Sequence, residues 1–174
     1  FKVRNIEAFL AKWRTAGLEV GSEFTGAEGF SNAYVMAPDD VWVELQEDPA
    51  LPVEVAGYHI HFFTPDFEEL LDWYTGVFSI ERRARGRIQT TTDVPGMNMS
   101  FGGAREPTVG TQGRSLDHIG FEVDDLEAVC EKLEARGIEF DVAYREVASI
   151  ELKVAFLTDP AGVYIELTEG FDEY

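Results

Sequence analysis

The sequence has a single cysteine, few basic residues and no long apolar run. Cys130 excludes a disulfide within the 174-residue chain, and its apolar helical position indicates a core residue. Fourteen Lys and Arg against 33 Asp and Glu give a formal net charge of −19. This negative charge is spread along the chain and repels phosphate backbones and anionic lipids, so it disfavours nucleic-acid and membrane partners.

No signal peptide and no apolar run of transmembrane length is present, from which we expect a cytoplasmic location. The chain begins at Phe1, without a Met, in the middle of a pattern, and we therefore expect further residues before it. Hydrophobic residues make up 45% and aromatic residues 13%, which is enough for a packed core.

Residues 155–170 contain the most informative pattern in the sequence. It predicts a strand, an Asp-Pro-x-Gly turn, and a second strand in which apolar residues alternate with Tyr164 and Glu166. A carboxylate in the middle of such a strand needs a partner. The same phrase occurs at residues 33–46, where Glu44 occupies the position of Glu166.

This echo is part of a longer internal repeat. Several residues between Phe121 and Glu139 are of the same amino-acid type as the residues 120 positions earlier, between Phe1 and Glu19. The middle of the chain repeats the layout more loosely, with His59 at the position of His118 and Ser100 at that of Glu166. The sequence therefore predicts three copies of a strand–helix–strands module, the first without its opening strand.

The helix of each copy has its own start signal. Asn5 is a predicted N-cap, residues 64–66 begin the second helix, and Asp124 with Glu127 resembles a capping box. The arginine-rich segment 80–89 is predicted to be an exposed edge strand; the alternative is a segment that anchors an acidic substrate.

Three motifs together carry a family resemblance. Residues 117–126 (DHIGFEVDDL), the helix 73–78 (WYTGVF) and residues 159–166 (DPAGVYIE) resemble the vicinal oxygen chelate superfamily. That superfamily includes glyoxalase I, methylmalonyl-CoA epimerase, extradiol dioxygenases and bleomycin-binding proteins. The resemblance implies an α+β fold of tandem βαβββ modules paired into half-open barrels, with metal ligands on the first and last strands.

The resemblance also implies a domain organisation. Residues 57–174 are expected to form a complete two-module domain (57–108 and 115–170), preceded by a linker at 51–56. Residues 1–50 are then an incomplete module. Its apolar helix and unfinished sheet predict packing against a missing N-terminal module or against another chain, as in a homodimer.

The candidate metal ligands are His59, His118 and Glu166, which match the family's ligand positions. Alternation places all three histidines of the protein on the concave side with one carboxylate, although each histidine taken alone is consistent with a packing role. Two imidazoles and a carboxylate suit a divalent Fe, Mn or Zn. Ser100 stands where four-ligand members have another carboxylate or amide, and Glu44, without a visible histidine partner, is not expected to be a ligand.

Other residues on the same faces are candidates for chemistry or substrate contact. His61 is predicted to be a general base or a support for a ligand, with simple packing as the alternative. Tyr164 is a candidate donor to a bound oxyanion, or an aromatic core residue. Asn98 and Ser100 are candidate substrate contacts.

Two functions remain open at this stage. The first is a metal-dependent lyase, isomerase or dioxygenase that binds a small oxygenated substrate through two neighbouring oxygens. The second is a metal-free small-molecule or drug-binding protein of the bleomycin-resistance type. Residues 150–158 lack the His and Tyr that the resemblance to extradiol dioxygenases would require.

Overall fold

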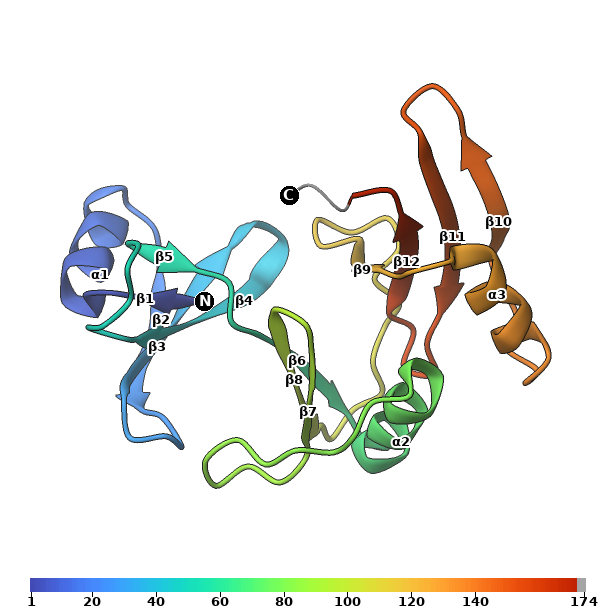
Figure 1. Ribbon diagram of the computed structural model, residues 1–174. Coiled ribbons are helices and arrows are strands. Elements are labelled where there is room, and N and C mark those ends of the chain that lie inside the picture. The colour runs from blue at the N-terminus through green and yellow to red at the C-terminus, as the bar shows by residue number, and fades with distance from the viewer. Residues whose placement is uncertain (172–174) are drawn as a thin grey trace. The chain divides into compact units, whose positions relative to one another are not determined.

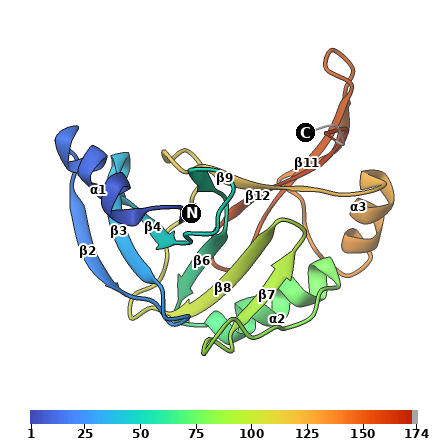
Figure 2. The same cartoon turned by 60° about the vertical axis from the view of Figure 1, so that its left-hand side comes forward.

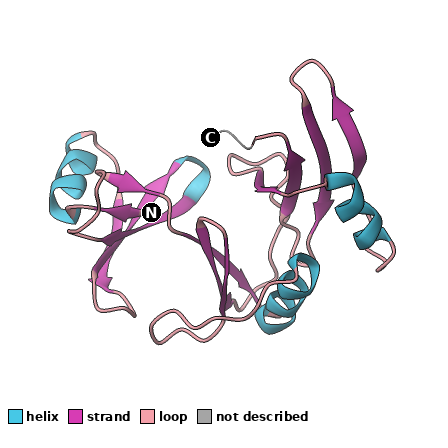
Figure 3. Ribbon diagram, viewed as in Figure 1, coloured by secondary structure: helices cyan, strands magenta, loops and turns pink. Residues whose placement is uncertain are grey.

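The computed structural model describes residues 1–171. Its contacts divide the chain into two compact units, Phe1–Arg105 and Glu106–Tyr174 (Figure 1). The first unit contains two modules and the second contains one. Each module combines one helix with a sheet, as the colouring by secondary structure makes clear (Figure 3). None of the helices that the structure describes is long and apolar enough to cross a membrane.

The first module of unit 1 packs helix α1 (Ile6–Thr15) on a five-stranded sheet in the order β2-β3-β4-β1-β5. The strands are β1 (Lys2–Val3), β2 (Val20–Thr25), β3 (Ser31–Ala37), β4 (Val41–Glu47) and β5 (Val55–Ala56), with a short 3-10 turn at Pro38–Asp40. Asn5 begins the helix by accepting the backbone N–H of Ala8 at 2.9 Å. The core between helix and sheet consists of Val3, Ile6, Leu10, Ala33, Val35 and Leu45.

The second module of unit 1 packs helix α2 (Phe67–Phe78) on a three-stranded sheet in the order β6-β8-β7 (Figure 2). Its strands are β6 (His59–Thr64), β7 (Thr91–Val94) and β8 (Met97–Gly103). The ring of Phe62 lies 4.9 Å from that of Tyr74 and 4.8 Å from that of Phe101. This apolar packing directs the even-numbered side chains of β6 toward the helix and the odd-numbered ones to the opposite face.

Unit 2 is the third module. Helix α3 (Leu126–Glu134) packs on a sheet in the order β10-β11-β12-β9. The strands are β9 (His118–Glu122), β10 (Val142–Val147), β11 (Leu152–Thr158) and β12 (Tyr164–Glu169). At the Asp-Pro-x-Gly turn, Asp159 Oδ1 accepts the backbone N–H groups of Ala161 and Val163, each at 2.8 Å. Gly162 has φ of 88°, a conformation that favours glycine.

The predicted α+β fold of repeated βαβββ modules is confirmed. The expected two-module domain 57–174 stays a prediction. The structure places the second module with the first, in residues 1–105, and the third in the other unit. The repeat identifies the modules but carries no information on which two share contacts. The expected linker 51–56 contributes β5, which pairs with β1. Residues 172–174, the end of the expected domain, lie outside the described residues.

Two local predictions are corrected. Segment 80–89 is not a strand: it forms only isolated bridges, one of them between Arg85 and Ile88. The side chain of Arg85 is only 11% exposed, because it makes buried contacts that alternation in the sequence does not reveal. The N-cap of α3 is Asp125, whose Oδ1 accepts the N–H of Ala128, rather than Asp124.

The corrected cap makes a testable prediction. Asp125→Ala is expected to lower the free energy of unfolding by about 1–2 kcal/mol, because it removes the cap and leaves alanine at a φ of 51°. Asp124→Ala, which removes the same charge one residue earlier, is expected to change it by less than about 0.5 kcal/mol. Denaturant unfolding of both variants measures the difference, and equal losses would contradict the assignment.

Candidate metal centre

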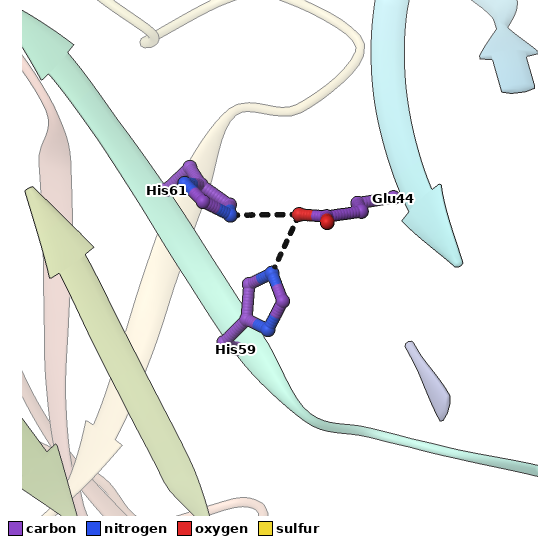
Figure 4. Close-up of side chains that lie close together, drawn as sticks. All are labelled: Glu44, His59 and His61. Atoms are coloured by element: carbon purple, nitrogen blue, oxygen red, sulfur yellow. Dashed lines mark hydrogen bonds and ion pairs between the residues drawn. The ribbon is translucent and has the colours of Figure 1, made fainter. Parts of the chain in front are cut away.

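Three side chains of unit 1 converge on one point: Glu44 from β4, and His59 and His61 from β6 (Figure 4). The Nε2 atom of His59 lies 2.9 Å from Glu44 Oε2, and that of His61 lies 2.8 Å from the same oxygen. We call these residues the Glu44 cluster. Within the described part of the chain, it is the one group of three or more His, Cys, Asp or Glu residues spaced to hold a metal ion.

Strand alternation brings the two histidines together. His59 and His61 are two positions apart on β6, so their rings share one face and lie 4.5 Å apart at an angle of 80°. On β4, the neighbouring Leu45 is buried in the core of the first module, which leaves Glu44 on the opposite face. The two apolar cores of unit 1 therefore fix which side of each strand carries the polar cluster.

Further polar contacts orient the cluster. Asn32 Nδ2 donates to Glu44 Oε1 at 2.7 Å, and the hydroxyl of Tyr34 lies 3.4 Å from Oε2. On the far side of the His59 ring, Arg85 Nη1 lies 2.8 Å from Nδ1. Both oxygens of the Glu44 carboxylate and both nitrogens of the His59 ring consequently have a partner.

The cluster is largely shielded from solvent, with exposed side-chain fractions of 2% for His59, 11% for Glu44 and 24% for His61. Burial raises the pKa of Glu44, but hydrogen bonds from His59, His61 and Asn32 outweigh burial and hold this pKa well below its ordinary range. Burial lowers the pKa of His59, assisted by the nearby charge of Arg85. The carboxylate is therefore charged and His59 is neutral near pH 7.

This donor set fits a divalent metal ion. Two neutral imidazoles and one carboxylate are ligands that Fe(II), Mn(II) and Zn(II) accept. Ligand atoms about 2.1 Å from such an ion lie about 3.0–3.4 Å from one another in octahedral or tetrahedral geometry. The two nitrogen–oxygen distances of 2.8 and 2.9 Å are close to that spacing. All three donor atoms lie within 4.8 Å of one another, close enough to share one ion.

The other predicted ligands, His118 and Glu166, belong to unit 2. His118 Nε2 lies 3.5 Å from Glu166 Oε2, and His118 Nδ1 lies 2.8 Å from Asp117 Oδ1. The parallel pairing of β9 with β12 places the two on one face, as alternation predicted. The joint set of His59, His118 and Glu166 stays a prediction.

The remaining candidates have mainly structural partners. Tyr164 is buried, and its ring stacks on Phe156 at 5.0 Å. Burial raises the pKa of its hydroxyl, which keeps it protonated. Ser100 Oγ donates to Asn98 Oδ1 at 3.0 Å, and both side chains are buried beside β6. The predicted roles of these residues in catalysis or substrate contact stay predictions.

Sequence reasoning passed over Glu44, which the structure places at the centre of the cluster. The signal was present in the repeat, because Glu44 occupies the position that Glu166 has in the third module. The sequence alone does not favour a ligand role for it, because no histidine of the first module accompanies it. Its histidine partners come instead from the second module, which follows from the way the modules share unit 1.

Comparison with known proteins identifies the family of this chain. A model of the Glyoxalase/Bleomycin resistance protein/Dioxygenase superfamily matches residues 57–167, more than half of the chain. The chain belongs to this superfamily. The match begins in the second module, so it includes His59 and His61 but leaves out Glu44 and the whole first module.

Solved structures of this superfamily share the fold. Two variants of glyoxalase I from Zea mays have TM-scores of 0.68 and 0.66 at 16% and 14% identity. The alignments cover 97% of this chain and 66% and 67% of the maize chains, so the chain spans about two thirds of that protein's length. A glyoxalase family protein from Enterococcus faecalis has a TM-score of 0.50 at 22% identity, covering 64% of this chain and 94% of its own.

The low pKa of Glu44 predicts how its contribution to stability depends on pH. In the chelator-treated protein, Glu44→Gln is expected to lower the free energy of unfolding by about 1–3 kcal/mol at pH 7, because it removes a charged partner of two largely shielded imidazoles. A carboxyl whose folded pKa is depressed stabilises the fold above its unfolded value of 4.5. The difference between wild type and variant should therefore shrink as pH falls below that value.

Urea unfolding from pH 7 to pH 3 measures this difference. Glu23→Gln, at an exposed ion pair with Arg14 in the same module, is the matched control and is expected to change stability by no more than about 1 kcal/mol. A Glu44→Gln penalty that stays constant over the whole pH range would contradict the assignment.

Proposed function

We propose that the Glu44 cluster holds a divalent metal ion and that the chain acts as a metal-dependent enzyme of the vicinal oxygen chelate type. The observation that carries this proposal is the convergence of two imidazole nitrogens and one carboxylate oxygen, all three within 4.8 Å of one another. Membership of the superfamily supports it. The resemblance implies ligands on the first and last strands of the modules, and β6 and β4 are such strands.

The metal would supply Lewis acidity. One carboxylate and two neutral imidazoles leave a 2+ ion with residual positive charge and open positions, which suits a small substrate that offers two adjacent oxygens. Fe, Mn and Zn all suit this donor set. The substrate class that follows is a small oxygenated molecule with neighbouring carbonyl, hydroxyl or carboxylate oxygens.

The protein's own contribution is to orient the ligands before anything binds. Asn32 Nδ2 holds Glu44 Oε1 at 2.7 Å, which restricts rotation of the carboxylate and keeps Oε2 directed at the two imidazoles. Phe63 stacks on the His61 ring at 5.4 Å and an angle of 1°. These contacts fix the donor atoms and lower the entropic cost of assembling the site.

Exposed aromatic rings beside the cluster favour a substrate with an apolar part. Phe63 is 51% exposed and Trp42 is 58% exposed. Trp42 packs edge-on against Tyr34, which itself neighbours Glu44 on the sheet. We infer that an apolar group of the substrate lies against these rings while its oxygens reach the cluster.

In this proposal His61 is a ligand, whereas the sequence suggested a base or a support. His118 and Glu166 then form a separate pair in unit 2, with Tyr164 nearby. The set of His59, His118 and Glu166 is the competing ligand assignment.

A second candidate is a metal-free small-molecule binding protein, and one observation favours it. The donors and acceptors of Glu44 and His59 are already paired with each other, with Asn32 and with Arg85. The cluster is therefore stable as a hydrogen-bonded network without an ion, and the exposed rings of Phe63 and Trp42 would provide an apolar binding surface.

Equilibrium zinc titration of the chelator-treated chain tests the ligand assignment. We expect one zinc ion per chain, with affinity reduced at least about 100-fold in Glu44→Ala and His61→Ala, because each substitution removes a protein ligand. His118→Ala and Glu166→Ala, the matched changes in unit 2, are expected to leave the affinity within about threefold.

The reverse pattern would support the ligand set of His59, His118 and Glu166 and would contradict the proposed one. Ser100→Ala serves as a further control, since the Ser100 hydroxyl is already bonded to Asn98. If Ser100→Ala alone lost zinc, the assignment of Glu44, His59 and His61 as the ligands would be wrong.

The two candidate functions differ in how a chelating ligand binds. We expect 4-nitrocatechol, which carries two adjacent oxygens on an aromatic ring, to bind the metal-loaded chain at least about tenfold more tightly than the chelator-treated chain. Its absorbance reports directly on metal coordination. Equal affinity with and without metal, reduced by Trp42→Ala, would favour the metal-free binding protein instead.

A further inference from the structure

Arg85 is the one residue around the Glu44 cluster whose chemistry opposes metal binding. Its side chain is only 11% exposed, and Nη1 lies 2.8 Å from His59 Nδ1. The same Nη1 lies 3.8 Å from Glu28 Oε2, and the guanidinium carbon lies 5.2 Å from the centre of the Tyr58 ring. Its Nε atom is buried without a hydrogen-bond partner among the described residues.

The direction of the Arg85–His59 hydrogen bond follows from the atoms involved. A guanidinium group has only donors, so His59 Nδ1 must be the acceptor and carries no proton. A neutral imidazole has a single N–H, which is then on Nε2. That N–H faces Glu44 Oε2 at 2.9 Å and donates to it. In this tautomer both ring nitrogens of His59 have a hydrogen-bond partner.

The same tautomer places a proton on the nitrogen that would bind the metal. Nε2 is the His59 atom directed at the cluster, and a protonated imidazole nitrogen has no lone pair to donate. If Nε2 binds an ion, the proton must move to Nδ1, where it would confront the N–H of Arg85. Two donors cannot face each other at 2.8 Å.

We propose that Arg85 is a positioning residue that holds His59 in the Nε2–H tautomer, so that a divalent ion binds only by displacing the guanidinium from Nδ1. The proposal rests on the function proposed for the Glu44 cluster. The proton balance is simple: one proton leaves Nε2 and one is taken up at Nδ1, so His59 stays neutral and Arg85 keeps its charge throughout.

The surroundings of Arg85 offer it an alternative position. Glu28, already 3.8 Å from Nη1, accepts the Tyr58 hydroxyl at 2.6 Å and has further acceptor capacity. Lys2 lies over the Tyr58 ring at 4.8 Å, with Asp48 bonded to it at 2.9 Å. A shift of the guanidinium toward Glu28 would shorten an ion pair that is now long, and would release His59 Nδ1.

The positive charge of Arg85 also opposes metal binding. A guanidinium in contact with one ligand lies close to the position where a 2+ ion would bind, and the two positive charges repel each other across a shielded space. Arg85 therefore opposes metal binding in two ways, through the His59 tautomer and through charge repulsion. The site is expected to bind an ion more weakly than its donor set alone would allow.

The tautomer can be observed in the wild-type chain. In the metal-free wild-type chain, long-range 1H–15N NMR spectra of the histidine rings are expected to show His59 with a protonated Nε2 and an unprotonated Nδ1; His59→Gln assigns the signal. A ring protonated at Nδ1 in the metal-free chain would overturn the proposal. After zinc loading, the spectrum should change to the Nδ1–H form.

Zinc affinity tests the displacement. Arg85→Met is expected to bind zinc at least about tenfold more tightly than wild type in a competition titration with a chromophoric chelator. Arg83→Met is the matched control, since it removes the same charge from the same segment at an exposed ion pair with Asp93. It should change the affinity by less than about twofold. Unchanged or weaker binding by Arg85→Met would overturn the proposal.

The two proposals fail in different ways. If no form of the chain binds zinc, the proposed function fails and the displacement with it, whereas the metal-free NMR spectrum still decides whether Arg85 fixes the tautomer. If wild type binds zinc through the Glu44 cluster but Arg85→Met binds no better, only the role of Arg85 is wrong. A thermal melt of Arg85→Met shows whether that variant folds, and the tautomer itself is read from the wild-type spectra.

Discussion

The candidate site depends on the alternation of side chains between the two faces of β6. Phe62 is anchored against Tyr74 and Phe101, and a shift of one residue in register would bury both histidines and expose that ring. The cost of such a shift is the loss of an aromatic core contact, worth several kcal/mol. The polar cluster is thus held in place by apolar packing on the opposite side of the same strand.

The fold could be predicted because its signals are local or periodic. The internal repeat, the helix cap at Asn5 and the alternation along β6 are each written in neighbouring residues, and the structure agrees with all three. The site could be predicted only in part. Facing directions of His59 and His61 follow from alternation, but the identity of their carboxylate partner depends on which modules pack together, and repeats leave that open.

Arg85 shows the same limit more sharply. A segment with four arginines in six residues has the composition of a solvated edge, and for Arg82 and Arg83 that interpretation agrees with their exposed ion pairs. Arg85 is buried because one long-range contact, to a ring 26 positions earlier in the chain, outweighs composition. Long-range polar contacts of this kind have no period, and a single sequence does not reveal them.

Gly102 has a consequence for how the site could diversify. A methyl group added at this position would come within 2.8 Å of the Phe63 ring, which now lies over the bare backbone. Phe63 is half exposed, so an outward turn of its ring would let the strand accept alanine, and the ring would then leave its stack on His61. One added carbon atom on β8, which belongs to no donor group, would thus move an exposed aromatic ring beside the cluster and change which molecules fit against it.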